Sequence, residues 1–317
     1  MVHYTIRRLL SSLIVLFIVS LLTFIVTRVL FPNPAQVILG GQNSAATPEQ
    51  IARLNHQLGL DQPVIVQYFK WLGAALTGNL GRSYLLPASV TSTIGARIPV
   101  TVELMVLAIA LAVLGGLVLG AIGALRRGKW EDTATSTTSV LALSFPNFFL
   151  GILLIYVFSL TFRVLPSGGY VPFLGDPLAN LRYIILPAVT LAAAYVGTFA
   201  RYTRSLMSTV LGEDYILRAH ASGIRPSVVV GRYAVRNTLV PLITVIGVNV
   251  AGLVGGAVVT ETIFSLPGIG TLLTTSILGD DLPVLQGLVL VIAVGVVVIN
   301  FIVDLVYGLI DPRIRVS

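Results

Sequence analysis

Long apolar runs dominate this sequence and decide what kind of protein it can form. A helix needs about 20 apolar residues to cross roughly 30 Å of hydrocarbon, because every backbone polar group must be satisfied within the segment. With 56% hydrophobic and 10% charged residues, the chain of 317 residues has more apolar surface than a soluble core could bury. The sequence therefore predicts an all-α integral membrane protein with six transmembrane helices. The predicted spans are residues 9–30, 98–125, 133–162, 183–200, 237–260 and 282–303.

Lysine and arginine are unevenly divided between the two sides of these spans. Six spans place both termini on one side, and most of the 20 Lys and Arg residues fall on that side, on short segments. Both termini are therefore predicted to be cytoplasmic. The net charge of +7 does not indicate nucleic-acid binding, because the arginines lie at the ends of apolar runs and do not alternate with exposed aromatic residues. The lipid bilayer is the expected partner of these charges.

Residues 31–97 form a long predicted external loop between the first two spans. Its segment 48–77 is expected to be helical in places. The amphipathic stretch 64–76, with Tyr68 and Trp71, is expected to lie at the outer membrane interface.

The start of the chain has a second interpretation, a cleaved signal peptide, because Arg7 and Arg8 precede the first apolar run. The run is long for a signal peptide, and no small-x-small cleavage site follows it. An uncleaved first span is the better prediction.

The one substantial predicted cytoplasmic segment, residues 201–236, contains a stretch with the features of a short, self-contained helix. Its acidic residues come first and its basic residues last, where each complements the helix dipole. Gly212 precedes the stretch, and Gly223 offers a left-handed cap before Pro226. Small residues near its end permit close approach of another protein. From these features alone, a solvated loop whose arginines anchor topology is an equally good interpretation. The residues singled out are Glu213, Asp214, Tyr215, Arg218, Ala219, Ala221 and Gly223.

Motifs along essentially the whole chain match one protein family. They occur at residues 59–63, 78–84, 98–104, 146–151, 213–224, 232–241, 261–270 and 283–315. Each is weak alone, but in this order they are specific. The stretch 213–224 resembles the EAA-type coupling loop, and the whole set resembles the dipeptide, oligopeptide and nickel permeases of ABC importers. Asn79 departs from the acidic residue common in that branch, so we assign it no role.

The resemblance implies a type I ABC importer permease fold with both termini in the cytoplasm. It implies an N-terminal helix plus external loop over residues 1–94, a transmembrane domain over 95–310 and a cytoplasmic tail over 311–317. The implied partners are a second homologous permease, two nucleotide-binding ATPase subunits and an extracytoplasmic solute-binding protein, at the cytoplasmic membrane of a prokaryote. The helix within 213–223 would dock into a groove of an ATPase subunit, and transport would proceed by alternating access.

The chain itself is not expected to be an enzyme. It has no Gly-x-x-x-x-Gly-Lys-Ser/Thr phosphate loop, so ATP and Mg are expected on partner subunits. No catalytic residue, directly bound cofactor or metal site is expected, because cysteine is absent and His3, His56 and His220 are scattered.

Residues that interrupt the spans are candidates for the translocation path. Pro146 should kink the third span. The kink could serve either to line the path or to shape the packing of helices. Residues 267–270 must break a helix, and non-helical backbone at membrane depth is tolerated where it lines a cavity or is buried in protein. The gate or path candidates are Pro146, Glu261, Pro267, Gly268 and Gly270.

Polar residues recur at helical spacing near the end of the last span. Asn300 and Asp304 share a face with Tyr307 and Asp311. We single out Asn300 and Asp304 as candidates for subunit contact, with interfacial solvation of Asp304 as an equal alternative.

Three other kinds of membrane protein were weighed against an importer permease. An ion-coupled secondary transporter would show paired charges or broken helices at the bilayer midplane, and the midplanes here are nearly free of charge. An intramembrane enzyme would need a nucleophile or a metal cluster. A passive channel is not distinguished by the sequence, and neither is the identity of the solute.

Overall fold

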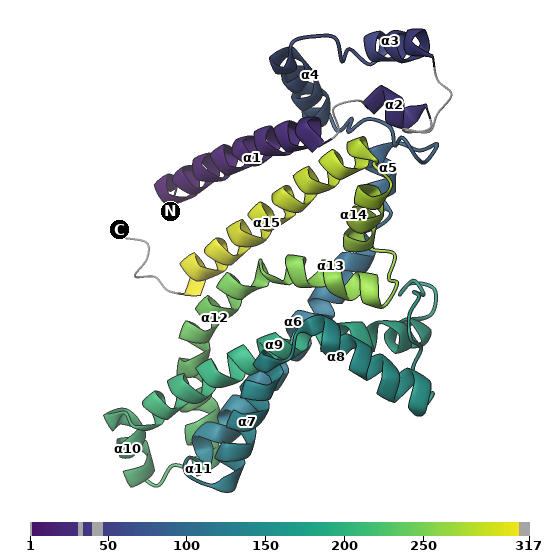
Figure 1. The fold of residues 1–317 in the computed structure, drawn as a ribbon. Helices are drawn as coiled ribbons and strands as arrows, with labels where there is room; N and C mark the ends of the chain where they lie inside the picture. The colour runs from purple at the N-terminus through teal and green to yellow at the C-terminus, as the bar shows by residue number, and fades with distance from the viewer. Residues whose placement is uncertain (1, 31–33, 40–46, 311–317) are drawn as a thin grey trace. The chain divides into compact units, whose positions relative to one another are not determined.

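Helices account for most of the described chain (Figure 1). The computed structural model describes residues 2–30, 34–39 and 47–310. Within that part of the chain, five helical runs without a sharp bend are long and apolar enough to cross a membrane, and a bent pair makes a sixth if it is counted as one span. The elements are α1 (Val2–Leu30), α2 (Pro34–Ile38), α3 (Pro48–Gln57), α4 (Val64–Leu76), α5 (Val90–Gly95), α6 (Ile98–Leu125), α7 (Trp130–Ser144), α8 (Asn147–Leu154), π-helical η2 (Ile155–Thr161), α9 (Pro177–Leu211), α10 (Asp214–Ala221), α11 (Pro226–Val228), π-helical η3 (Val229–Val235), α12 (Arg236–Val250), α13 (Leu253–Ile263), α14 (Ile269–Leu278) and α15 (Leu282–Ile310).

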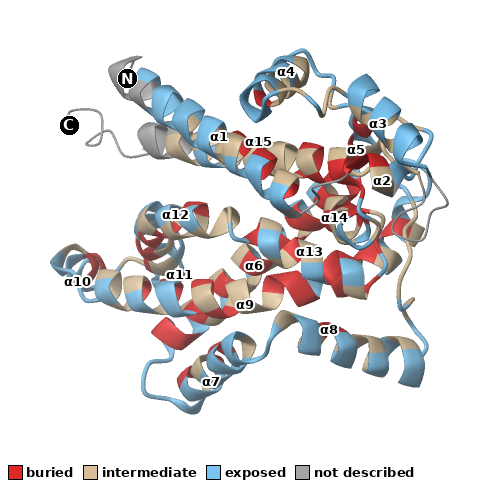
Figure 2. Cartoon of the chain, turned by 45° about the horizontal axis from the view of Figure 1, so that its top comes forward, coloured by how far each residue is buried: buried red, intermediate tan, exposed pale blue. Residues whose placement is uncertain are grey.

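One compact unit comprises Thr101–Leu266 and the last part of α15. Its central element is α9, which packs against α7, α8, α12 and α13. More than half of the apolar window of α9 is buried, and Figure 2 shows its many buried residues. Helix α6 approaches α9 closely through Gly120, where an added Cβ would lie 2.5 Å from Cβ of Thr203. Small residues at such crossings let helix backbones pack tightly in a membrane.

A second compact unit comprises Val2–Val100 and Pro267–Val298. Its hydrophobic core joins α5, α14 and the first turns of α15 through Val90, Ile94, Leu272, Val284 and Leu288.

Polar contacts tie the loop and helices of this second unit together. The buried carboxylate of Asp281 accepts hydrogen bonds from the Ser83 hydroxyl and, at 3.1 Å, from the Tyr84 amide. Helix α1 is joined to α15 by a hydrogen bond of 2.6 Å from Gln286 Nε2 to Thr27 Oγ1. The expected helices within the external loop are confirmed as α3 and α4.

The third predicted span is divided at Pro146. Helix α7 ends at Ser144, and α8 continued by η2 leaves the break at 104° to α7. Proline has no N–H to donate, and it forces the preceding Phe145 into an extended conformation. The predicted kink is therefore confirmed, and it is sharp enough to separate two helices.

The fifth predicted span has different bounds from those expected. The helical run covers 226–250, not 237–260, and α13 follows as a separate helix. The break coincides with Gly252, where an added Cβ would lie 3.1 Å from the Tyr195 hydroxyl of α9. Helix α9 continues to Leu211 and the next helical run begins at Pro226, so the chain between them, with α10, covers 212–225 of the predicted cytoplasmic segment 201–236.

Candidate functional site

The candidate coupling segment folds as the short helix α10, closed at its C-terminal end. Gly223 adopts φ +76°, the left-handed conformation that glycine favours. The Ile224 amide donates to the Ala219 carbonyl at 3.2 Å, and the Gly223 amide donates to the His220 carbonyl at 3.0 Å. These two bonds form a Schellman cap that satisfies carbonyls at the helix end. The predicted cap at Gly223 is confirmed.

The inner face of α10 is anchored by an apolar cluster. Ile216 is 1% exposed and packs with Ala219 and Val229, and Val210 and Leu211 at the end of α9 join the same cluster. Burying an isoleucine side chain stabilises by about 2 kcal/mol. The helix is therefore fixed to the end of α9 and to η3.

The outer face of α10 is polar apart from Leu217 and the small Ala221. Glu213, Asp214, Arg218 and Ala221 are exposed, and Leu217 among them is 58% exposed. Ala219 was expected on this face because it is small, but it is 8% exposed and packs inward. Residues 216 and 219 are three positions apart on a helix and share one face, so Ala219 follows Ile216 into the chain.

Tyr215 links α10 to the span that follows it. Asn237 Nδ2 in α12 donates to the Tyr215 hydroxyl at 3.0 Å and to the Tyr233 carbonyl at 2.9 Å. The apolar cluster connects α10 to α9, and this bond connects it to α12, so α10 is joined to both neighbouring long helices.

A charged pair braces α9 near the same end. Arg204 Nε and Nη2 in α9 donate to the two carboxylate oxygens of Asp132 in α7, at 2.5 and 2.9 Å. The Gly128 amide donates to the same carboxylate at 3.0 Å. A bidentate pair of this kind fixes orientation as well as distance. No sequence motif indicated this contact, which joins residues 72 positions apart.

A cavity of about 660 Å³ lies beside this pair, within the first unit. Hydroxyl groups line much of it, from Thr135, Ser136 and Ser139 of α7 and from Thr198 and Ser205 of α9. Our interpretation of the sequence missed this cavity. The sequence feature that could have indicated it is the run 133–139 at the start of the third predicted span, where most residues are Thr or Ser.

Two of the path candidates lie in one group of packed helices. Pro146 precedes α8, and α8 packs against α13, which carries Glu261. Glu261 is fully buried and accepts a hydrogen bond of 2.6 Å from the Thr101 hydroxyl. Neither residue lines the hydroxyl-rich cavity.

The remaining path candidates lie at the link between α13 and α14. Pro267 and Gly268 are non-helical, as predicted. Gly270 was also expected in the break, but α14 begins at Ile269 and Gly270 is a buried residue of its first turn. The N–H groups of a first helical turn need no partner within the helix, which lets a helix begin directly after Gly268.

The subunit-contact candidates lie on α15. Asn300 is exposed and Asp304 half-buried, one helical turn apart. Asp311 falls outside the described residues. In the described part of the chain, no group of three or more His, Asp or Glu side chains is placed to hold a metal ion.

Comparisons with known proteins cover nearly the whole chain. Residues 116–316 match the family described as binding-protein-dependent transport system inner membrane component, and residues 1–105 match the family of the N-terminal part of such membrane components. A putative peptide transport system permease protein of Brucella abortus (strain 2308) is 43% identical over 309 residues, 98% of each chain. The di/tripeptide transport system permease protein DppB of Pseudomonas aeruginosa (strain UCBPP-PA14) is 38% identical over 335 residues, 99% of each chain.

A solved structure has a similar fold. A chain of the MetNI methionine ABC transporter, in an inward-facing conformation, matches with a TM-score of 0.56 and 16% identity, over 69% of this chain and 96% of that chain. The predicted fold class, an all-helical membrane protein similar to ABC importer permeases, is confirmed.

Proposed function

The chain belongs to the family of binding-protein-dependent transport system inner membrane components, and we propose that it forms half of the translocation path of an importer for peptides or related small solutes. The family implies a binding protein and an ATPase as partners, with the ATPase activity on partner subunits. The chain is a multi-pass component of the inner membrane. Peptides are proposed because the relatives carry peptide and di/tripeptide transport in their names.

The observation that supports the proposed mechanism is that α10 is packed against the chain by one face and exposes the other. Its inner face is fixed by Ile216 and Ala219, and its exposed face presents Asp214, Leu217 and Arg218. An exposed leucine among charged groups suits the surface of another protein, since a charged rim gives specificity and a central apolar side chain gives affinity. We assign this face to a groove of the ATPase subunit.

The contacts around α10 explain how ATPase movement would reach the membrane. The apolar cluster joins α10 to α9, the Tyr215–Asn237 bond joins it to α12, and the Asp132–Arg204 pair joins α9 to α7. A push on α10 would therefore move these helices together, which is the requirement for alternating access. Packed helices respond by shifting as bodies because their interfaces are close-packed.

We place part of the path at the hydroxyl-lined cavity between α7 and α9. Hydroxyl groups can donate to and accept from the amides of a peptide without holding a charge in the membrane. Residues 198–205 precede the end of α9 at Leu211 by roughly 10–20 Å of helix. With both termini cytoplasmic, as we propose from the charge distribution, this cavity would lie in the cytoplasmic half of the path.

The remaining assignments complete the proposal. A second homologous permease would supply the other half of the path, with Asn300 and Asp304 at the contact. Pro146, Glu261, Pro267, Gly268 and Gly270 remain candidates for gating. The functional division we propose is 1–94, 95–310 and 311–317.

The direct test is purification of the tagged chain from its native membrane in a mild detergent, followed by mass spectrometry and an ATPase assay. We expect a second permease and ATPase subunits to accompany the chain. ATP-dependent uptake in membrane vesicles should be inhibited by di- or tripeptides and not by the free amino acids. Recovery of the chain alone, without ATPase activity, would instead favour a secondary transporter or a channel.

A further inference from the structure

A second cavity, of about 510 Å³, lies wholly within the unit formed by Val2–Val100 and Pro267–Val298. Its lining comes from the end of α1, from the α3–α4 region, from Tyr84 and from the first turn of α15. Phe24, Trp71 and Tyr84 give it aromatic walls. The volume is in the range of small-molecule sites, roughly 300–1,000 Å³. No part of the proposed transport mechanism uses this cavity.

The charge of the lining has one sign. Arg28, Lys70 and the ring of His56 line the cavity, and its lining includes no Asp or Glu among the described residues. The Asp281 carboxylate, beside the lining residue Leu282, accepts hydrogen bonds from Ser83 and Tyr84. The Asp61 carboxylate is paired with His56, whose Nδ1 lies 2.7 Å from Asp61 Oδ2. That hydrogen bond holds the pKa of Asp61 below its usual value. The cavity therefore favours an anionic ligand.

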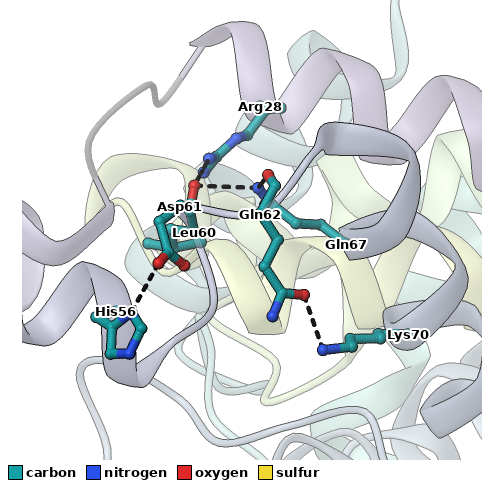
Figure 3. Close-up of polar contacts among 7 residues, drawn as sticks. All are labelled: Arg28, His56, Leu60, Asp61, Gln62, Gln67 and Lys70. Atoms are coloured by element: carbon teal, nitrogen blue, oxygen red, sulfur yellow. Dashed lines mark hydrogen bonds and ion pairs between the residues drawn. The ribbon is translucent and has the colours of Figure 1, made fainter.

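The two long cationic side chains are held by neutral groups, as Figure 3 shows. Arg28 Nη2 donates to the Leu60 carbonyl at 3.2 Å, and Lys70 Nζ donates to Gln62 Oε1 at 2.7 Å. Gln67 Nε2 donates to the carbonyls of Leu60 and Gln62, at 3.1 and 2.7 Å, and so fixes the same loop. These contacts orient the cations without neutralising them.

Exposed apolar surface adjoins the cationic cavity. Lys70 also borders a shallow hollow formed by Ile65, Val66 and Phe69 on α4, and Ile65 is 66% exposed. Val29, next to Arg28 on the apolar helix α1, is exposed as well. A ligand that spans both features has an anionic head and an apolar tail.

We propose that this cavity binds the phosphate headgroup of an anionic phospholipid, whose acyl chains lie along the exposed apolar surface of α4 and α1. Cations at the membrane interface attract anionic headgroups, and the aromatic walls suit the same depth. A soluble phosphate would meet the same cations but would leave the apolar surface unused. The lipid would fix α1 and α4 to one another and to the bilayer.

The test measures lipid selectivity with the assembled transporter. The purified complex is equilibrated with mixed micelles holding equal phosphatidylglycerol and phosphatidylcholine, and the lipids it retains are counted by native mass spectrometry. We expect phosphatidylglycerol to be enriched. Arg28→Gln and Lys70→Gln should each reduce the enrichment, by roughly fivefold per cation removed.

Matched variants separate a site from general electrostatics. Arg53→Gln removes an exposed cation from α3 that does not line the cavity, and Lys70→Arg keeps the charge. Neither should change the enrichment. If Arg28→Gln fails to assemble, Lys70→Gln carries the test, because Lys70 is on the surface.

Two outcomes would overturn the proposal. One is equal loss of enrichment in Lys70→Gln and Arg53→Gln, or no enrichment in the unmodified complex. The other is displacement of the lipid by millimolar inorganic phosphate or glycerol phosphate, which would assign the cavity to a soluble anion. ATPase partners and peptide uptake are measured separately, so neither result bears on the proposed transport function.

Discussion

Two helices outside the predicted spans, α10 and α4, bury different kinds of side chain. In α10, Ile216 points into the chain and the outer face is mostly charged. In α4, the polar-tipped Tyr68 is buried and Ile65 and Phe69 are exposed. A helix with a charged outer face suits contact with a soluble protein, whereas exposed apolar residues flanking a lysine suit a lipid interface. The difference supports both proposals, that α10 docks on an ATPase subunit and that α4 meets the bilayer.

The sharpest test of this difference is a matched pair of isoleucines. Ile216→Ala should destabilise α10 by about 3 kcal/mol, because it leaves a cavity at a site that is 1% exposed. Ile65→Ala, at an exposed position in α4, should change stability by about 0.5 kcal/mol or less. Hydrogen exchange of the amides in each helix measures both effects in the assembled complex. Equal effects at the two positions would show that the inner and outer faces are assigned wrongly.

Breaking the Asp132–Arg204 pair between α7 and α9 is expected to cause the next largest loss of stability. Arg204→Leu leaves the Asp132 carboxylate, 9% exposed, without its cationic partner. Asp132→Leu leaves Arg204, which is 39% exposed and can reach water, so this variant should lose less stability. The Gly128 amide still donates to Asp132, which keeps the loss for Arg204→Leu below that for Ile216→Ala.

Thermal unfolding of both variants and of the double variant measures the interaction between Asp132 and Arg204. We expect the double variant to be more stable than Arg204→Leu alone. A double variant whose loss equals the sum of the single losses would show that the two residues do not interact.

A pair of glycines tests the cap of α10. Gly223→Ala should destabilise the end of the helix by about 1 kcal/mol, because an alanine is strained at φ +76°. Gly231→Ala is the control, since Gly231 is helical and has open space at its Cβ position. Exchange of the amides of Ser222 to Ile224 should speed up only in the first variant. The same exchange rates in both would contradict the Schellman cap.

The smallest expected effect is a pH dependence at the start of the α4 region. His56 holds the pKa of Asp61 below 3.8, so the pair stabilises the loop above that pH and the contribution is lost as pH falls through the folded-state value. Both side chains are exposed, so the change should be small. The protection factors of the α3 amides, which are corrected for the intrinsic pH dependence of exchange, should fall below about pH 4 and stay level above about pH 5. Asp61→Asn should abolish this fall, and its persistence would assign the effect to another group.

The sequence predicted the elements whose signals are local. The apolar spans, the external helices, the break at Pro146 and the cap at Gly223 each depend on residues within one or two turns. Ala219 was misplaced although its spacing from Ile216 indicated the inner face. The hydroxyl-rich run before Val140 likewise indicated a polar cavity that we did not predict.

Contacts between distant parts of the chain left no comparable signal. The Asp132–Arg204 and Ser83–Asp281 bonds join residues 72 and 198 positions apart, and no single sequence encodes such pairings in its local pattern. Helix ends need not coincide with the ends of spans. Charged residues mark the predicted ends of spans, and α9 continues past Arg201 and Arg204 to Leu211, because a helix extends beyond its apolar part as long as packing supports it.

The outer face of α10 is the proposed docking surface for the ATPase, and charge reversal tests this role directly. Asp214→Lys with Arg218→Glu inverts a pair four positions apart on α10, and Glu49→Lys with Arg53→Glu inverts an equivalent exposed pair on α3. Each pair has its acid in the first turn, so both reversals lose the same favourable dipole interaction there. Arg218 also lies in the last turn of α10, whereas Arg53 is in the middle of α3, so the α10 reversal costs somewhat more. The measurement is the amount of ATPase subunit retained by the purified permease. We predict at least a tenfold weaker association, about 1.4 kcal/mol, for the α10 reversal and none for the α3 reversal. Full retention by the α10 variant would contradict the docking role of this helix.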